Sequence, residues 1–181
     1  MHALIVHGAE GHPGENWFPW LRGELEKIGI IVRVPHFPQP QSLGSWTRYL
    51  EASGNPEGHP EGSPAGKDSM LIGHSVGCAF ILALLERFRA RAAFLAAPFT
   101  GRLGIPYDRI NRSFVEREFN WEAIMQNCRS FFLYSSDNDP YVPLKHGFAL
   151  AVRLQSNLNI MLKNVARRFW AGSETPAFMP G

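Results

Sequence analysis

Short runs of apolar, often β-branched residues alternate along the chain with longer stretches in which apolar residues recur at helical spacing. This alternation predicts an α/β fold, because parallel strands must be joined by segments that cross over the sheet. We expect a parallel sheet covered by helices. The predicted strands cover residues 3–7, 30–34, 70–73, 92–96, 130–135 and 158–162, and the predicted helices cover 17–28, 45–52, 76–89 and 144–154.

Two segments interrupt this alternation without suggesting a second domain. The length of 181 residues, 45% of them hydrophobic, suits one domain over residues 1–181. Residues 53–66 are rich in Gly and Pro and predict a flexible surface loop. Residues 99–128 predict a pocket-forming insertion after the fourth strand. Its apolar residues either line an acyl pocket or face the core as ordinary helix residues: Phe114, Phe119, Trp121 and Ile124.

Charge and cysteine content argue against several classes of function. A formal net charge of +2 without a Lys/Arg cluster does not favour a nucleic-acid partner. Cys78 and Cys128 are too few for a disulfide framework, and the histidines and cysteines lack metal-ligand spacing, so we expect no cofactor or metal. No apolar run suggests a signal peptide or a membrane span, and we expect a cytoplasmic protein. Composition does not predict the oligomeric state.

The most informative motif is Gly73-His74-Ser75-Val76-Gly77, which fits the pattern G-x-S-x-G. It follows a predicted strand and opens a predicted helix, as a nucleophile elbow does. In that geometry Ser75 is the nucleophile on a strained, tight turn, and the Val76 N–H points at a developing oxyanion. The alternative is a plain turn in which Ser75 serves as a helix N-cap.

Further site candidates follow two other strands. Asp137 and Asp139 come after the fifth strand, at the carboxyl edge of the sheet where open α/β proteins place their sites. Either one is a candidate triad acid, and both are equally suited to ordinary turn contacts. The loop after the first strand offers Gly8 or Ala9 as the second backbone donor of an oxyanion hole. This loop does not match the dinucleotide-binding pattern G-x-G-x-x-G.

The chain resembles the small serine hydrolases of the retinoblastoma-binding and YdeN type over nearly its whole length. The resemblance implies a compact α/β-hydrolase fold with a minimal lid, a Ser–Asp–His triad and ester hydrolysis. With this fold we expect the strands in the spatial order 2-1-3-4-5-6 and helices on both faces. It favours Asp139 over Asp137, because the family acid directly precedes the proline. The matching stretches are His7-Gly8, Asn16-Trp17-Phe18-Pro19-Trp20-Leu21, Pro35-His36-Phe37-Pro38-Gln39-Pro40, Gly73-His74-Ser75-Val76-Gly77-Cys78, Ala96-Ala97-Pro98-Phe99 and Asp137-Asn138-Asp139-Pro140-Tyr141-Val142-Pro143.

One position departs from the family pattern. The triad histidine is expected just after the last strand, but Arg168 stands there, and no histidine follows His146. Arginine keeps its charge and cannot accept the serine proton, so we expect impaired activity unless His74 or His146 substitutes. Arg168 could instead pair with Asp139. The closing helix after the last strand is also expected to be missing.

These patterns predict a serine hydrolase that acts on small-molecule esters or related acyl substrates. The alternative is a catalytically inactive binding protein on the same scaffold. No Leu-x-Cys-x-Glu segment supports binding to a retinoblastoma-type partner. In the predicted helix 144–154, a stripe formed by Leu144, Phe148, Ala151 and Val152 is expected to face the core, which turns His146 toward solvent.

Overall fold

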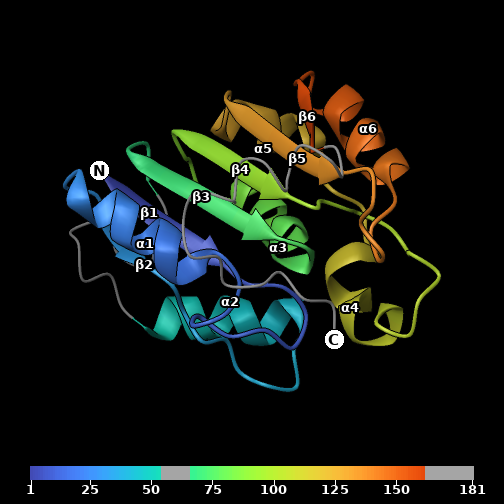
Figure 1. Cartoon of the computed structure of the whole chain (residues 1–181), viewed down its shortest axis with the longest axis horizontal. Coiled ribbons are helices and arrows are strands. Elements are labelled where there is room, and N and C mark those ends of the chain that lie inside the picture. The colour runs from blue at the N-terminus through green and yellow to red at the C-terminus, as the bar shows by residue number, and fades with distance from the viewer. Residues whose placement is uncertain (54–65, 162–181) are drawn as a thin grey trace.

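The computed structural model describes residues 1–53 and 66–161, which contain six strands and six helices (Figure 1). The loop predicted over residues 53–66, the closing helix and Arg168 therefore lie wholly or mostly outside the described residues. The strands are β1 (His2–Val6), β2 (Ile31–Arg33), β3 (Ser69–His74), β4 (Ala92–Ala96), β5 (Phe131–Ser136) and β6 (Leu158–Met161). The helices are α1 (Phe18–Lys27), α2 (Leu43–Ala52), α3 (Val76–Leu85), α4 (Asp108–Val115), α5 (Trp121–Asn127) and α6 (Leu144–Arg153).

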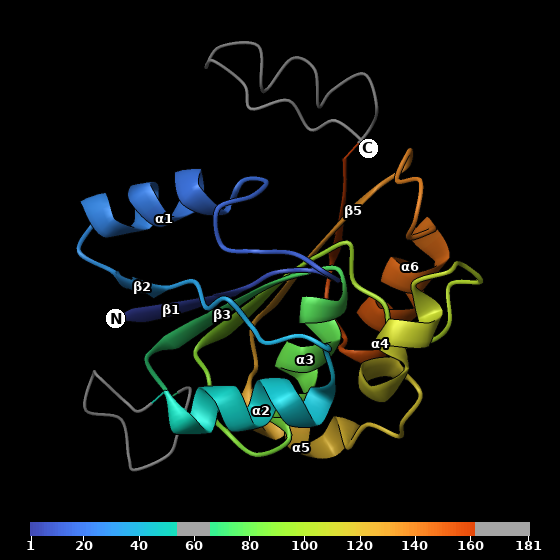
Figure 2. The same ribbon diagram turned by 90° about the horizontal axis from the view of Figure 1, so that it is seen from below.

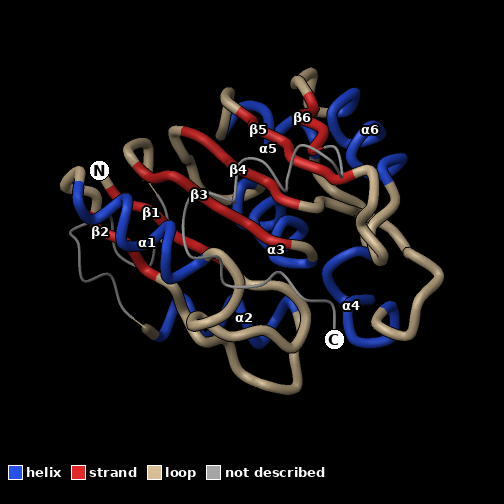
Figure 3. The backbone as a smooth tube through the Cα atoms, in the orientation of Figure 1, coloured by secondary structure: helices blue, strands red, loops and turns tan. Residues whose placement is uncertain are grey.

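The six strands form one parallel sheet in the order β2-β1-β3-β4-β5-β6, which confirms the predicted order (Figure 3). Every neighbouring pair is parallel. All strands therefore end at the same edge of the sheet. The loops after β1, β3 and β5, which carry the predicted site residues, leave the sheet at this edge.

Helices cover both faces, as predicted (Figure 2). On one face α1 packs over β1, β2 and β3 through a small cluster that includes Phe18 and Ile72. On the other face α2 to α6 share a larger core with the sheet, centred on α3. In α3 nine of the ten residues are buried, since this helix packs against β3 and against α4 and α5 at once.

The first face is covered unevenly in the described part of the chain. Phe132 and Tyr134 of β5 point to this face and are 41% and 36% exposed, while the alternate residues Phe131 and Leu133 are buried. Phe132 stacks on Phe94 of β4 at a ring-centroid distance of 4.7 Å. This half of the sheet therefore presents an aromatic surface beside the part that α1 covers.

Side-chain caps set two helix starts. Ser42 accepts a hydrogen bond from the Ser45 N–H and donates its own N–H to Ser45 Oγ, which is a reciprocal capping box. The helix consequently begins at Leu43, two residues before the predicted start. Asn120 caps α5 with a single hydrogen bond, which its side chain accepts from the Ala123 N–H.

The predicted core-facing stripe of α6 is wrong in part. Phe148 and Val152 are 49% and 80% exposed, and Gly147, Leu150 and Leu154 lie against the sheet instead. A Cβ at Gly147 would collide with Ser135 of β5. The helix turns its glycine toward the sheet because only that side allows so close an approach.

For three of the four apolar candidates in the insertion 99–128, the structure decides for the core, the second of the two alternatives. Phe114 and Ile124 are fully buried, Phe119 is 8% exposed, and all three belong to the larger core. They serve α4 and α5 as packing residues, since these short helices need apolar contacts with α3 to be stable. Trp121 is only partly buried and packs against the edge of that core.

Among residues 1–53 and 66–161 no helix is both long and apolar enough to cross a lipid bilayer.

Glycine at position 77 allows the first turn of α3 to contact β1. A Cβ on Gly77 would lie 2.6 Å from the carbonyl oxygens of both Val6 and His7, which are backbone atoms that cannot rotate away. A Cβ on Gly73 would meet the Cα and N of Cys78 at 2.9 Å. Both glycines of the G-x-S-x-G motif are therefore required by the packing of the bend between β3 and α3.

We expect Gly77→Ala to lower the free energy of unfolding by at least about 1–3 kcal/mol, the usual cost of overpacking. Gly23→Ala in α1 is the matched control, because a Cβ there meets nothing within 4 Å and alanine stabilises a helix interior by roughly 0.5–1 kcal/mol. Urea unfolding followed by circular dichroism measures both. Equal stabilities for the two variants would contradict this account of the bend.

Candidate active site

Ser75 occupies a sharp bend between β3 and α3. Its backbone angles are φ 56° and ψ −125°, in a region that L residues rarely adopt and that costs about 1–3 kcal/mol. The Ser75 N–H donates to the Ala96 carbonyl of β4 at 2.9 Å, which holds the bend against the sheet. The side chain makes no capping hydrogen bond, so the alternative in which Ser75 is an ordinary N-cap is wrong. The hydroxyl is left available at the carboxyl edge of the sheet.

The loop after β1 runs directly beside Ser75. A Cβ built on Gly8 would lie 3.1 Å from Ser75 Cβ and 3.6 Å from Ser75 Oγ, so the backbone passes close to the serine and a side chain there would crowd it. In the described residues neither the Gly8 N–H nor the Ala9 N–H has a hydrogen-bond acceptor. The Val76 N–H lies in the first turn of α3, where amides have no intrahelical partner. Unpaired backbone donors thus surround the hydroxyl, where they can stabilise an anion.

The two candidate acids differ in burial and in contacts. Asp139 is half-buried, and its Oδ1 accepts the N–H groups of Tyr141 and Val142 at 2.9 and 3.0 Å. Asp137 is exposed, and its N–H donates to the Met161 carbonyl of β6. The turn contacts predicted for an aspartate in this loop are therefore present at Asp139. They leave its second oxygen without a hydrogen bond from the described residues.

His74, next to the serine, is partly buried, and its Nδ1 is shielded from solvent. Its Nδ1 has no hydrogen-bond partner in the described residues, and its ring lies about 6 Å from the rings of Trp17 and Phe18. Burial lowers the pKa of His74 from its ordinary value of 6.5 to about 4, even though the negative charge of Asp139 raises it. Asp139 follows β5 and Ser75 follows β3, two strands that end at the same edge of the parallel sheet.

Sequence patterns missed three polar residues that hold the β1 loop. His7 is fully buried and bonds through Nδ1 to the Gly8 carbonyl at 2.8 Å. Gln41 accepts the Glu10 N–H at 2.8 Å and donates to Asn111 of α4 at 2.9 Å. Gln41 and Asn111 are 70 positions apart in the sequence, so no local sequence pattern predicts their contact.

The side chains of the remaining cysteine and histidine candidates form no hydrogen bond with Ser75 in the described residues. Burial raises the pKa of the Cys78 thiol far above its ordinary value, which suits a packing residue and not a nucleophile. His146 is partly buried; desolvation, assisted by the charge of Lys145, lowers its pKa, and the negative charge of Asp108 opposes that shift. His12 and His36 are exposed, as expected for loop histidines. Arg168 lies outside the described residues.

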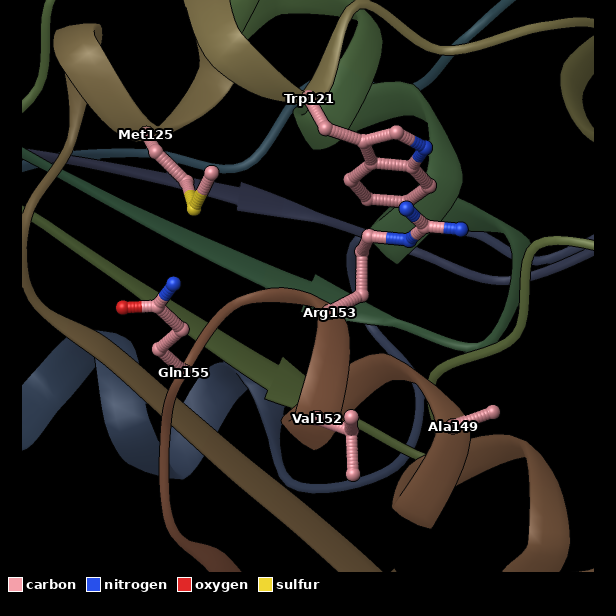
Figure 4. Close-up of a pocket in the computed structure, with 6 residues that line it drawn as sticks. All are labelled: Trp121, Met125, Ala149, Val152, Arg153 and Gln155. Carbon is pink, nitrogen blue, oxygen red and sulfur yellow. The ribbon is translucent and has the colours of Figure 1, made fainter.

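A cavity of about 400 Å³ lies between α5 and α6, and neither Ser75 nor Asp139 lines it (Figure 4). The Arg153 guanidinium lies 5.4 Å from the centre of the Trp121 ring at one side of this cavity. The cavity is therefore separate from the serine bend. It is lined by Trp121, Met125, Ala149, Val152, Arg153 and Gln155.

Comparison with known proteins places the chain among serine hydrolases. The serine hydrolase family model matches residues 3–165, and the match ends before Arg168. The serine hydrolase RBBP9 of Rattus norvegicus is 29% identical over 161 residues, which make up 86% of this chain and 81% of the rat protein.

Two solved structures share the fold at low sequence identity. The crystal structure of the ydeN gene product of Bacillus subtilis has a TM-score of 0.74 and 22% identity, covering 88% of this chain and 84% of that chain. Est1E of Butyrivibrio proteoclasticus, solved with ferulic acid bound, has a TM-score of 0.68 and 15% identity, covering 89% of this chain and 79% of that chain. With its sheet order, its serine bend and a family match over residues 3–165, the chain belongs to the serine hydrolase family and has the α/β-hydrolase fold.

Proposed function

We propose that the chain hydrolyses esters or related small acyl substrates, with Ser75 as nucleophile and Asp139 as the triad acid. The observation that carries the proposal is the strained backbone of Ser75, held between β3 and α3 with its hydroxyl uncommitted. The Val76 N–H and a second N–H from Gly8 or Ala9 are the oxyanion donors. Attack of Oγ on the acyl carbon then places the negative charge among backbone dipoles that are already oriented.

The proton of the Ser75 hydroxyl has no suitable acceptor in the described part of the chain. His74 is adjacent and neutral at pH 7, but a pKa of about 4 makes its imidazole a weak base. Both ring nitrogens of His7 are engaged by backbone groups. Arg168, at the position where the family places its histidine, keeps its proton. We therefore propose slow acyl transfer limited by the missing base.

The proposal is tested by comparing the native chain with Ser75→Ala and Arg168→His. We expect Ser75→Ala to abolish both p-nitrophenyl butyrate turnover and fluorophosphonate labelling. Arg168→His should raise kcat by about 10²–10⁴-fold, the usual contribution of a positioned general base. Turnover that survives in Ser75→Ala would contradict the proposal.

Circular dichroism of each variant shows whether it is folded and so separates a lost site from a lost fold. If the native chain and Arg168→His are both folded and both silent in the two assays, the inactive binding protein is the better description.

The role of Asp139 is tested in the Arg168→His background. Asparagine can still accept the Tyr141 and Val142 N–H groups, so Asp139→Asn keeps the turn while removing the charge. We expect it to cancel most of the gain from Arg168→His, a loss in kcat of up to about 10⁴-fold, because the imidazole loses its orienting carboxylate. In the native chain the same change should have little effect, since no imidazole is present to orient. Asp137→Asn is the matched control, and a larger loss from it would assign the acid to Asp137.

The lowered pKa of His74 also predicts a pH dependence of stability. Its pKa is about 4 when folded and 6.5 when unfolded, so below pH 6.5 the unfolded chain binds a proton that the folded chain does not. The free energy of unfolding therefore falls as the pH falls from 6.5 to 4, by about 3 kcal/mol from this residue. His74→Gln should remove this part of the slope in urea unfolding, whereas His36→Gln, at an exposed position, should not. If the free energy of unfolding depends on pH equally in the native chain and in His74→Gln, folding does not lower the pKa of His74.

A further inference from the structure

His7 has both ring nitrogens bonded to backbone groups that each allow only one role. The Gly8 carbonyl, 2.8 Å from Nδ1, can only accept, so Nδ1 carries the proton. The Phe37 N–H, 3.3 Å from Nε2, can only donate, so Nε2 holds the lone pair. The rings of Phe37 and Trp46, at centroid distances of 5.4 and 5.1 Å, pack against the imidazole and fix its plane. The tautomer and the orientation of His7 are therefore determined.

The bond from His7 fixes the direction of the next peptide group. The Gly8 carbonyl also accepts the Gly11 N–H at 3.3 Å, so two donors hold it. In a planar trans peptide the C=O and the following N–H point in opposite directions. The Ala9 N–H consequently points away from His7, and it has no acceptor in the described residues.

The same reasoning separates Ala9 from Gly8 as a donor. The His7 carbonyl faces Gly77, since a Cβ on that glycine would lie 2.6 Å from it. The Gly8 N–H, antiparallel to this carbonyl, therefore points away from the first turn of α3. Gly8 itself runs beside Ser75, as the 3.1 Å approach of its ideal Cβ to Ser75 Cβ shows. The next free amide along the loop is that of Ala9.

We propose that His7 is a positioning residue that turns the Gly8–Ala9 peptide so that the Ala9 N–H serves as the second oxyanion donor for Ser75. The inference rests on the proposed function of Ser75 and goes beyond it by assigning the donor and the side chain that aims it. Burial lowers the pKa of His7, which keeps the ring neutral at pH 7 with its single donor on Nδ1. A second clamp, from the Glu10 N–H to Gln41, limits movement of the loop on the far side of Ala9.

Two substitutions test the two hydrogen bonds of His7 separately. The side-chain amide of asparagine places an N–H near the position of Nδ1, so His7→Asn can still donate to the Gly8 carbonyl. Glutamine places an oxygen near Nε2, so His7→Gln can still accept from the Phe37 N–H but loses the bond to Gly8. Both remove the ring from the same buried site, so a merely structural role would affect both alike. His36→Gln, at the exposed neighbouring histidine, is the control.

Phenylboronic acid at pH 7, where the free acid is trigonal, provides a readout that needs no catalytic base. Ser75 Oγ forms a bond to boron, the boron becomes tetrahedral and anionic, and the hydroxyl proton passes to solvent. The ¹¹B NMR signal of tetrahedral boron yields the Kd, and the Ala9 amide resonance reports the new hydrogen bond. Hydrogen exchange of the Gly11 amide reports whether the Gly8 carbonyl keeps its direction.

We expect the native chain and His36→Gln to form the adduct and Ser75→Ala to form none. His7→Gln should weaken binding at least about tenfold, with faster exchange at Gly11 and no shift at Ala9, whereas His7→Asn should restore affinity to within about threefold of the native chain. Two results would overturn the role of His7 while leaving the proposed role of Ser75 intact, provided that the native chain forms the adduct. One is unchanged affinity in His7→Gln, and the other is an equal loss of affinity in His7→Gln and His7→Asn. Absence of an adduct in the native chain would overturn the proposed function of Ser75 and this inference with it.

Discussion

The close contact between the first turn of α3 and the ends of β1 and β3 is the constraint on which the site depends. It exists only because positions 73 and 77 lack side chains, and it forces Ser75 into a backbone region that costs about 1–3 kcal/mol. Burial of α3 offsets this cost. Fully buried side chains such as Phe80 and Leu82 contribute about 1.5–3 kcal/mol each, so a few of them outweigh the strain.

The parallel sheet then determines what can gather around the bend. Every strand ends at the same edge, so the loop after β1 brings Gly8 beside Ser75, and the loop after β5, which carries Asp139, leaves the sheet on the other side of β3. Free backbone amides from the β1 loop and from α3 make this edge favourable for negative charge. At the same edge His74 is partly buried beside Trp17 and Phe18, and this desolvation lowers its pKa and leaves the imidazole weakly basic. The arrangement favours a developing oxyanion more than it favours removal of the serine proton.

Local sequence patterns predicted the parts of the structure that depend on local rules. The alternation of strands and helices predicted a parallel sheet, the family resemblance added the order of its strands, and the G-x-S-x-G motif predicted a bend that needs two glycines. Helix phase was less predictable. In α6 the apolar Phe148 and Val152 face outward, because the helix turns Gly147 toward the sheet for a closer approach. Phe114 and Ile124 suited either a pocket or a core, and their contacts with α3 decided for the core.

The amino-acid sequence by itself determined the alternation of strands and helices, the place of the serine bend and the glycines that make it possible, because each follows from neighbours a few residues apart. Only the tertiary structure decided how the bend is surrounded. The bond between His7 and Phe37 joins residues 30 positions apart, and the bond between Gln41 and Asn111 joins residues 70 apart. Which polar groups find partners, and which amides stay free beside Ser75, depends on how distant segments exclude water from one another, and no local period in the sequence records that.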